Sequence, residues 1–204
     1  MPDFSFENAA RGLVAGIDEA GIGPWAGPVV AGAVILDQAT LPQQLLLDLD
    51  DSKKLKPAKR EALFQLLQDH ADIGLGISEV DEIDEINVLQ AALSAMGRAL
   101  DALEGKPDIA LVDGNRAPKL SCSIQCIIKG DELSLSIAAA SIVAKVTRDK
   151  IMENLADSFP GYGWEKNSGY GTKAHQDGLK RFGVTPHHRK SFKPIIKILG
   201  QESR

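Results

Sequence analysis

The sequence predicts an α/β fold formed by one domain. Five apolar runs have the length of strands, and segments with apolar residues at helical spacing lie between several of them. This alternation is typical of a sheet covered by helices. The chain has 204 residues without an internal repeat or linker, which is enough for one well-buried domain. The expected strands cover residues 13–17, 29–36, 73–80, 109–115 and 124–128.

Four helices are expected from apolar spacing and from residues that begin or end helices. The stripe from Ile86 to Leu103 is the clearest, and Gly105 and Pro107 follow it. The first half of the segment 133–155 is rich in alanine and almost wholly apolar, so this helix must be buried. The expected helices cover 57–70, 86–103, 133–155 and 172–182, the last with Thr172 as its cap.

Charge is distributed unevenly along the chain. The net charge is −5, but residues 163–204 carry +6 and residues 1–162 carry −11. The basic segment permits a phosphate-binding face, with a solvated basic tail as the alternative, and residues 185–194 are expected to lie on the surface. No apolar run reaches the ~20 residues of a membrane span, and the N-terminus lacks a signal core, so we expect a cytoplasmic protein. Cys122 and Cys126 would lie about 13 Å apart on one strand, so free thiols are expected.

Acidic side chains occur where three expected strands end. Asp18 and Glu19 precede a glycine-rich loop, Asp113 precedes Gly114, and Asp131 follows the last strand. Neighbouring side chains of a strand point to opposite faces, so we expect the strand to break at the loop and let Asp18 and Glu19 turn toward one site. Strand ends gather at one edge of the sheet, where oxygen-only ligands favour Mg²⁺ or Mn²⁺. Two such ions can support phosphodiester hydrolysis. Taken singly, each acid could instead belong to a polar turn or a helix cap.

Other sites fit the glycine loop less well. Gly27 comes one residue too late after Gly21 and Gly23 for a dinucleotide-binding motif. The chain contains neither the Gly-Lys-Ser/Thr of a P-loop nor the Gly-x-Ser-x-Gly turn of a serine hydrolase.

Several motifs, in this order along the chain, carry a family resemblance. They are 17–30 (Ile-Asp-Glu-Ala-Gly-x-Gly-Pro-x-Ala-Gly-Pro-Val-Val), 51–55 (Asp-Ser-Lys-Lys-Leu), 112–114 (Val-Asp-Gly), 129–131 (Lys-Gly-Asp), 138–149 (Ala-Ala-Ala-Ser-Ile-Val-Ala-Lys-Val-Thr-Arg-Asp), 169–172 (Gly-Tyr-Gly-Thr), His175 and 188–192 (His-Arg-x-Ser-Phe). Together they make the chain resemble ribonuclease HII, the bacterial type 2 ribonuclease H, over about residues 13–194.

The resemblance implies a ribonuclease H-like fold: a mixed five-stranded sheet flanked by helices, with a small helical C-terminal portion. It implies one catalytic domain over residues 1–204, in which 160–204 form a basic substrate-binding portion. The implied enzyme is a metal-dependent endoribonuclease that cuts the RNA strand of RNA–DNA hybrids. It also cuts 5′ of a single ribonucleotide in duplex DNA, leaving a 3′-hydroxyl and a 5′-phosphate. Such an enzyme removes ribonucleotides and RNA primers from DNA, and we expect it to be a monomer.

Site residues follow from the resemblance by motif. The implied catalytic and metal-binding carboxylates are Asp18, Glu19, Asp113 and Asp131, with Mg²⁺ or Mn²⁺ as cofactor. Asp149 resembles a supporting acid rather than a ligand. Backbone groups of Gly21, Ile22 and Gly23, together with Tyr170, are implied to recognise the 2′-hydroxyl that distinguishes RNA from DNA. The expected phosphate contacts are Lys53, Lys54, Lys145, Arg148 and Arg189. His175 and His188 could contact phosphate, or cap and pack.

One residue departs from the family pattern. Ile22 stands where the family usually has arginine. Recognition by backbone N–H groups survives this change, whereas a guanidinium contact does not, so we expect retained specificity with weaker substrate binding. The alternatives are a type 1-like ribonuclease H, a resolvase of the same fold, and a nucleic-acid-binding protein with a vestigial site.

Overall fold

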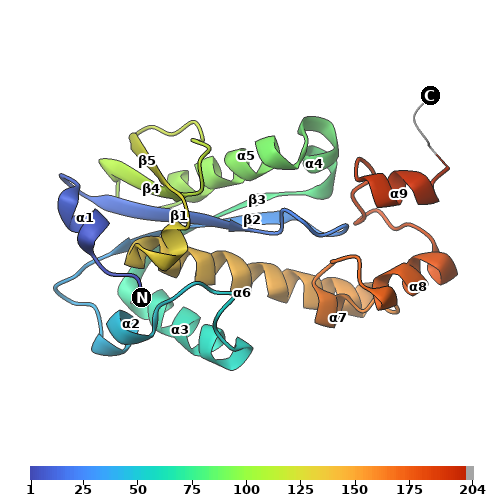
Figure 1. Ribbon diagram of the computed structural model, residues 1–204, viewed down its shortest axis with the longest axis horizontal. Coiled ribbons are helices and arrows are strands. Elements are labelled where there is room, and N and C mark those ends of the chain that lie inside the picture. The colour runs from blue at the N-terminus through green and yellow to red at the C-terminus, as the bar shows by residue number, and fades with distance from the viewer. Residues whose placement is uncertain (201–204) are drawn as a thin grey trace.

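A mixed sheet of five strands forms the centre of the protein (Figure 1), as the computed structural model shows for residues 1–200. The strands are β1 (Val14–Ala20), β2 (Val29–Leu36), β3 (Ala71–Ser78), β4 (Ile109–Asp113) and β5 (Ser123–Ile127). Their order is β3-β2-β1-β4-β5; β1 pairs antiparallel with β2 and β2 with β3, whereas β4 runs parallel to β1 and β5. The predicted five-stranded mixed sheet is therefore confirmed.

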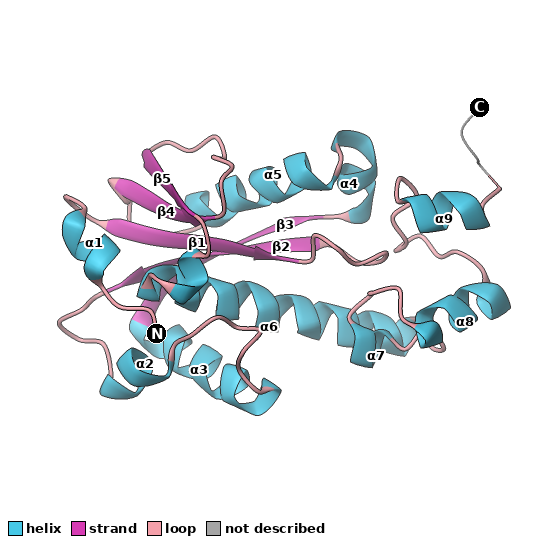
Figure 2. Cartoon of the chain, in the orientation of Figure 1, coloured by secondary structure: helices cyan, strands magenta, loops and turns pink. Residues whose placement is uncertain are grey.

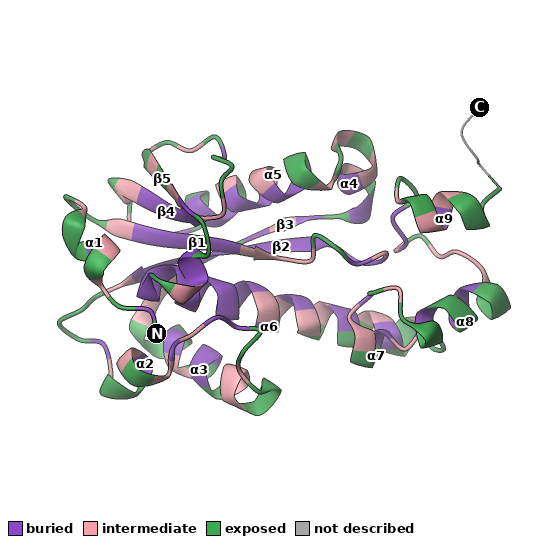
Figure 3. Cartoon of the chain, viewed as in Figure 1, coloured by how far each residue is buried: buried purple, intermediate pink, exposed green. Residues whose placement is uncertain are grey.

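Helices cover both faces of the sheet (Figure 2). One face packs on α6 (Leu135–Ser158), with α2 (Gln43–Asp48) and α3 (Pro57–His70) beside it. The other face packs on α5 (Val88–Asp101), which α4 (Val80–Ile86) precedes. A short helix, α1 (Ser5–Ala9), lies at the start of the chain. Buried residues are concentrated in the strands and along α6 (Figure 3), as expected for a layer enclosed on both sides.

Helix α6 approaches the sheet closely because both surfaces carry small residues. Ala138, Ala139 and Ala140 are fully buried along it. A Cβ atom at Gly16 of β1 would lie 2.1 Å from the backbone carbon of Ser136, and one at Gly32 of β2 would lie 2.7 Å from the carbonyl oxygen of Ala140. These glycines allow the long helix to lie against β1 and β2, and so fix its N-terminal end beside the acidic strand ends.

A smaller helical portion extends beyond the far end of α6 (Figure 1) and contains α7 (Trp164–Asn167), α8 (Lys173–Phe182) and α9 (Lys193–Ile198). Its core includes Tyr162, Trp164 and Leu179. The predicted cap of α8 is confirmed, because the Thr172 hydroxyl accepts a hydrogen bond from the His175 backbone N–H. Residues 201–204, the end of the predicted substrate-binding portion, lie outside the described residues.

The helix expected over 86–103 is confirmed as α5, which begins at Val88 because Asn87 adopts φ 69° and its side chain accepts hydrogen bonds from Leu89 and Gln90 N–H. Ile86 instead ends α4. Two expectations about local structure are wrong. The tail is not wholly on the surface, since His188 and Arg189 are fully buried. The second, the length of β1, concerns the site and is described below. Cys122 and Cys126 are free thiols, as expected. Within residues 1–200, no helix is both long and apolar enough to cross a membrane.

Candidate active site

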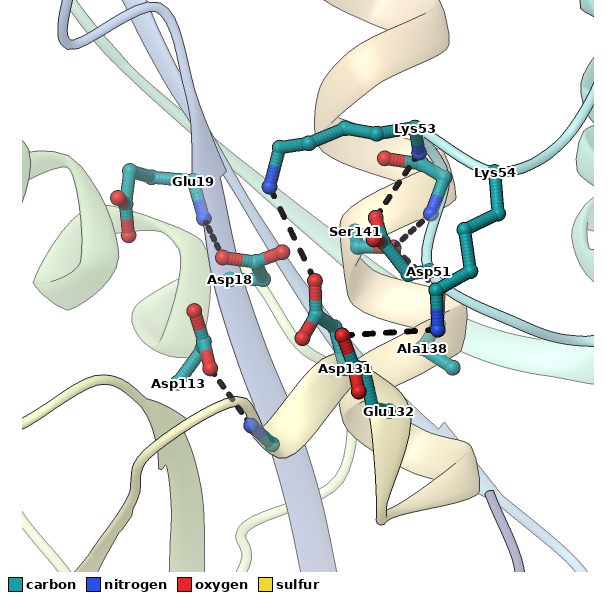
Figure 4. A network of polar contacts seen from close by, with 12 residues as sticks. Asp18, Glu19, Asp51, Lys53, Lys54, Asp113, Asp131, Glu132, Ala138 and Ser141 are labelled. Atoms are coloured by element: carbon teal, nitrogen blue, oxygen red, sulfur yellow. Dashed lines mark hydrogen bonds and ion pairs between the residues drawn. The ribbon is translucent and has the colours of Figure 1, made fainter. Parts of the chain in front are cut away.

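Three acidic side chains from separate parts of the sequence meet beside the centre of the sheet (Figure 4). Ile17 of β1 pairs with Val112 of the parallel strand β4, so Asp18 and Asp113 are neighbours one residue further along. Asp131 lies in the 3₁₀ helix η1 (Gly130–Glu132), which links β5 to α6. The backbone N–H of Gly130 donates to Asp113 Oδ1 at 2.7 Å, so η1 positions Asp113 as well as Asp131.

The first strand continues through both of its acids, contrary to the expectation that it breaks before them. Because Asp18 and Glu19 are consecutive residues of β1, their side chains leave the strand on opposite sides. Figure 4 shows Asp18 toward Asp131 and Lys53, and Glu19 on the other side of the strand. The Glu19 backbone N–H donates to Asp18 Oδ1 at 2.7 Å, which holds Asp18 in place.

The carboxylates destabilise one another's charged forms. Asp18 is only 3% exposed, and burial, followed by repulsion from Glu19 and Asp113, raises its pKa well above the ordinary value. Burial and Asp113 raise the pKa of Glu19 to about 7. Burial and Asp113 raise the pKa of Asp131 to about 6, with Asp51 adding to the effect. The cluster therefore gains stability from any positive charge placed within it.

A lysine supplies part of that positive charge. Lys53 Nζ lies 3.8 Å from Asp131 Oδ2, and its side chain is 74% exposed whereas that of Asp131 is 8% exposed. The nearby Asp51 was not predicted as a site residue, although it belongs to the same motif. Asp51 Oδ1 accepts from the Lys53 backbone N–H at 2.9 Å, and Ser52 N–H donates to Ser141 Oγ of α6 at 3.3 Å (Figure 4). These two hydrogen bonds fix the loop that contains Lys53 against helix α6.

The donor set suits a hard divalent cation, because Asp18, Glu19, Asp113 and Asp131 offer oxygen atoms only. Within residues 1–200, no three His, Cys, Asp or Glu side chains are drawn together tightly enough to enclose an ion. The evidence that this site suits a divalent cation is therefore the oxygen donors and the repulsion between the carboxylates. It is not a set of ligands already arranged around an ion.

A pocket of about 290 Å³ connects this cluster to the glycine loop. It is lined by Glu19, Ala20, Gly21, Ile22, Gly23, Ser52, Lys53, Lys145, Arg148 and Tyr170. Tyr170 is 51% exposed, and a Cβ atom at Gly23 would lie 3.4 Å from its ring. A pocket of about 920 Å³ beside β3 is larger, but none of the predicted site residues lines it. The volume of a pocket therefore does not identify the candidate active site.

Two buried arginines hold the backbone of the glycine loop. Arg189 is fully buried, and its guanidinium donates to the carbonyl oxygens of Gly21, Ile22, Gly27 and Pro28 at 2.6–3.2 Å. Arg148 donates to the carbonyl oxygens of Pro28, Ser168 and Ala26 at 2.9–3.1 Å. This corrects the expectation that Arg148 and Arg189 contact phosphate, because backbone carbonyls occupy their guanidinium groups. We call these two side chains the arginine clamp.

Gly21 shows how closely the clamp fits. It has φ +106°, and a Cβ atom there would lie 2.2 Å from Arg148 Nε and 2.8 Å from the Pro28 carbonyl oxygen. Only glycine combines this backbone conformation with so close a contact. Burial and the neighbouring Arg148 lower the pKa of Arg189 to about 9, so its guanidinium is still charged at neutral pH.

A buried pair of histidines holds the backbone of Tyr170 in place. His175 Nδ1–H donates to the Tyr170 carbonyl oxygen at 3.0 Å, so His175 Nε2 is free to accept from Trp164 Nε1–H at 3.1 Å. His188 Nδ1 accepts from Thr185 N–H at 2.9 Å, and its Nε2 lies 3.0 Å from His175 Nε2. This pattern requires both rings to be neutral and places the protons on His175 Nδ1 and His188 Nε2. Two roles were considered for His175 and His188, contact with phosphate and packing or capping. Both side chains are fully buried, so they pack within the fold.

The two remaining predicted lysine contacts, Lys145 and Lys54, are paired within the fold. Lys145 Nζ lies 2.6 Å from Asp149 Oδ1, which also accepts from Ser168 Oγ at 3.0 Å. Lys145 lines the pocket, while Asp149 joins α6 to the loop before Tyr170. Lys54 Nζ lies 3.5 Å from Glu132 and 3.6 Å from Asp50, away from the glycine loop.

The sheet and its acidic strand ends define the class of protein. A ribonuclease H2 from Pyrococcus horikoshii OT3 has the same fold, with a TM-score of 0.77 and 31% identity, covering 93% of this chain and 98% of that one. Bst-RNase HIII, solved in complex with Mn²⁺, has a TM-score of 0.73 and 18% identity, covering 93% of this chain and 70% of that one, and it shows the fold alone. The protein thus has the ribonuclease H fold.

Sequence similarity gives the particular family. The family model described as ribonuclease HII matches residues 15–195. A ribonuclease HII from Paramagnetospirillum magneticum is 56% identical over 199 residues, which covers 98% of this chain and 99% of that protein. The chain belongs to the ribonuclease HII family, a family of nucleases.

Proposed function

We propose that this protein is a metal-dependent endoribonuclease that cuts the RNA strand of RNA–DNA hybrids and cuts 5′ of single ribonucleotides in duplex DNA. The products are a 3′-hydroxyl and a 5′-phosphate, and the cellular roles are removal of ribonucleotides and RNA primers from DNA. One observation carries the proposal: repelling carboxylates lie beside a pocket lined by the backbone of a clamped glycine loop.

The proposed ligands of two divalent ions, Mg²⁺ or Mn²⁺, are Asp18, Glu19, Asp113 and Asp131. When bound, such ions supply an activated water and stabilise the leaving oxygen of a phosphodiester. The chain's own contribution is to hold the ligands. The Glu19 and Gly130 N–H groups orient Asp18 and Asp113, and Lys53 offers its exposed ammonium to a substrate phosphate next to Asp131.

The glycine loop is proposed to recognise the ribose. Because the arginine clamp binds the carbonyl oxygens of Gly21 and Ile22, their peptide dipoles are fixed and backbone N–H groups are left for a ligand. Tyr170 can pack on the sugar and hydrogen-bond to its 2′-hydroxyl. Ile22 and Gly23 contribute backbone, and Lys145 lines the same pocket as a candidate phosphate contact.

The proposal includes residues 160–204 as the basic portion that binds the duplex, within one catalytic domain over residues 1–204. The part from α7 to α9 supports this, because it brings Tyr170 to the pocket and Arg189 to the carbonyl oxygens of the glycine loop. We also propose that the enzyme acts as a cytoplasmic monomer.

The test is cleavage of three labelled duplexes: DNA with one ribonucleotide, DNA with four consecutive ribonucleotides, and a continuous RNA–DNA hybrid. Each is incubated with Mg²⁺, Mn²⁺ or EDTA. Cleavage immediately 5′ of the single ribonucleotide, lost in EDTA, is the expected result. Cleavage that requires four ribonucleotides would instead indicate a type 1-like ribonuclease H, and metal-dependent cutting of branched DNA alone would indicate a resolvase. No cleavage of any substrate would indicate a vestigial site.

A further inference from the structure

A buried glutamate near the start of the chain contacts the segment that carries Asp131. Glu7 of α1 is 8% exposed, and it precedes the residues that match the ribonuclease HII family model. Its Oε1 accepts from Ser134 Oγ at 2.6 Å, Ser136 Oγ at 2.7 Å and Ser136 N–H at 2.9 Å. Ser134 caps α6 by accepting from Ile137 N–H at 3.2 Å. One carboxylate oxygen thus holds the junction between η1 and α6.

The backbone next to Glu7 holds the same junction from a second point. The Asp3 N–H donates to the Leu133 carbonyl oxygen, and the Asp3 carbonyl oxygen accepts from Leu135 N–H, both at 3.2 Å. Ser134 N–H in turn donates to the Gly130 carbonyl oxygen at 2.8 Å. The first residues of the chain therefore hold the segment that follows η1 in place. Ser134, at the centre of this segment, is three residues from Asp131.

The fold satisfies only one of the two carboxylate oxygens of Glu7. Glu7 Oε2 is buried and has no hydrogen-bond partner among the described residues. Leaving a buried carboxylate oxygen unpaired lowers stability, and a smaller or uncharged side chain avoids that cost. The charge does suit the N-terminal end of the 24-residue helix α6, where four backbone N–H groups lack partners within the helix.

We propose that Glu7 is a positioning residue for the metal site, acting through η1 on Asp131 and Asp113. The path is short: Glu7 fixes Ser134 and Ser136, this junction fixes η1, and η1 carries Asp131 and orients Asp113 through the Gly130 N–H. Residues that hold metal ligands in place commonly change metal affinity by about 10- to 100-fold when removed. This inference rests on the proposed metal-dependent function.

The experiment is calorimetric titration of the full-length protein with Mn²⁺, without substrate, at pH 8. Glu7→Ala is expected to weaken Mn²⁺ binding about tenfold. Glu7→Gln keeps the Oε1 acceptor and is expected to weaken it less, which also provides a reading if the alanine variant does not fold. Thermal melting of each variant is measured alongside.

Asp84→Asn is the matched control. Asp84 also accepts from two backbone N–H groups and a serine hydroxyl, those of Lys190 and Ser191, at 2.6–2.9 Å, but it does not touch η1. Its loss is expected to leave Mn²⁺ affinity unchanged. Lower melting temperatures of both Glu7 variants with wild-type Mn²⁺ affinity would overturn the positioning role. A wild-type protein that binds no Mn²⁺ would overturn the proposed function, and this inference with it.

Discussion

The carboxylate cluster (Asp18, Glu19, Asp113 and Asp131) and the arginine clamp both place ionisable side chains inside the fold. They differ in whether the fold supplies partners for the charge. In the cluster, Asp18, Glu19 and Asp131 repel their neighbours, and Lys53 offers only an exposed ammonium in return. In the clamp, backbone carbonyl oxygens accept from the guanidinium nitrogens of Arg148 and Arg189.

The difference separates two roles that residue type cannot distinguish. A buried charge whose partners are all within the fold holds the structure together. A buried charge that the fold leaves uncompensated is open to a partner from outside, here a cation. Substitutions in the cluster and in the clamp separate the two roles, and those in the cluster have the largest expected effect.

Asp18→Asn is expected to lower the rate of cleavage on the order of a thousandfold, because a metal contributes several kcal/mol to the transition state. The measurement is single-turnover cleavage of a duplex with one ribonucleotide. Glu61→Gln is the control, since this exposed carboxylate already pairs with Lys150 at 2.8 Å; its rate is expected to stay within about twofold of wild type. Similar rates for wild type and Asp18→Asn would remove the cluster from catalysis.

Arg189→Lys is expected to lower the free energy of unfolding by about 3 kcal/mol, because three or more carbonyl oxygens lose a donor in a buried site. Cleavage of the single-ribonucleotide duplex should fall more than cleavage of a continuous hybrid, since the glycine loop loses its fixed shape. Urea denaturation measures the first effect. Arg181→Lys is the control because Arg181 lies over the Phe182 ring at the surface. An Arg189→Lys protein as stable as wild type would show that the clamp is dispensable.

Acid is expected to weaken the support of Tyr170. Burial, followed by His175, lowers the pKa of His188 to about 4 from 6.5. The unfolded chain therefore takes up a proton at a higher pH than the native protein does. The stabilisation is complete above pH 6.5 and is lost as the pH falls toward 4, by up to about 3 kcal/mol. Urea denaturation of wild type and His188→Asn from pH 7 to 4 measures it as the difference between the two proteins, because the raised pKa values of Glu19 and Asp131 act in the opposite direction in both. His70→Gln, an exposed site, is a control that keeps the dependence. A difference that does not change with pH would contradict a neutral histidine pair.

Ile22→Arg is expected to have the smallest effect, a tightening of substrate binding by up to about fivefold, the range of one exposed ion pair. Ile22 is 37% exposed, and its backbone carbonyl oxygen accepts from Arg189. We therefore expect the new guanidinium to reach phosphate without disturbing the loop. Binding is measured in EDTA, with Ile22→Gln as the uncharged control. Equal affinities for wild type, glutamine and arginine would show that this position does not face substrate.

Sequence patterns predicted the sheet and its acids because both depend on local signals. The run of β-branched residues at 29–36 is a strand with those bounds, and Thr172 caps α8 as its residue type suggests. Acids after apolar runs placed Asp18, Asp113 and Asp131 near one another. The pattern did not show that β1 continues through Glu19, because a glycine loop follows a strand end in either case.

The clamp and Glu7 could not be predicted in this way, because their partners are distant in sequence. Arg189 and Gly21 are 168 residues apart, and Glu7 and Ser134 are 127 residues apart. A basic tail read from composition is expected at the surface, yet Arg189 is buried on the loop carbonyls and His188 is buried against His175. Nothing in the local sequence of Glu7 distinguishes it from a surface acid.

The most direct test of the central claim is thermal unfolding of wild type and Asp18→Asn at pH 8, in EDTA and in Mg²⁺. In EDTA the variant is expected to melt a few degrees higher than wild type, because the substitution removes a buried carboxyl group whose ionised form burial, Glu19 and Asp113 disfavour, while the asparagine Oδ1 can still accept from Glu19 N–H. In Mg²⁺ only the wild type should gain stability. A wild type indifferent to Mg²⁺, or a variant that melts lower in EDTA, would contradict the account that uncompensated charge marks the metal site.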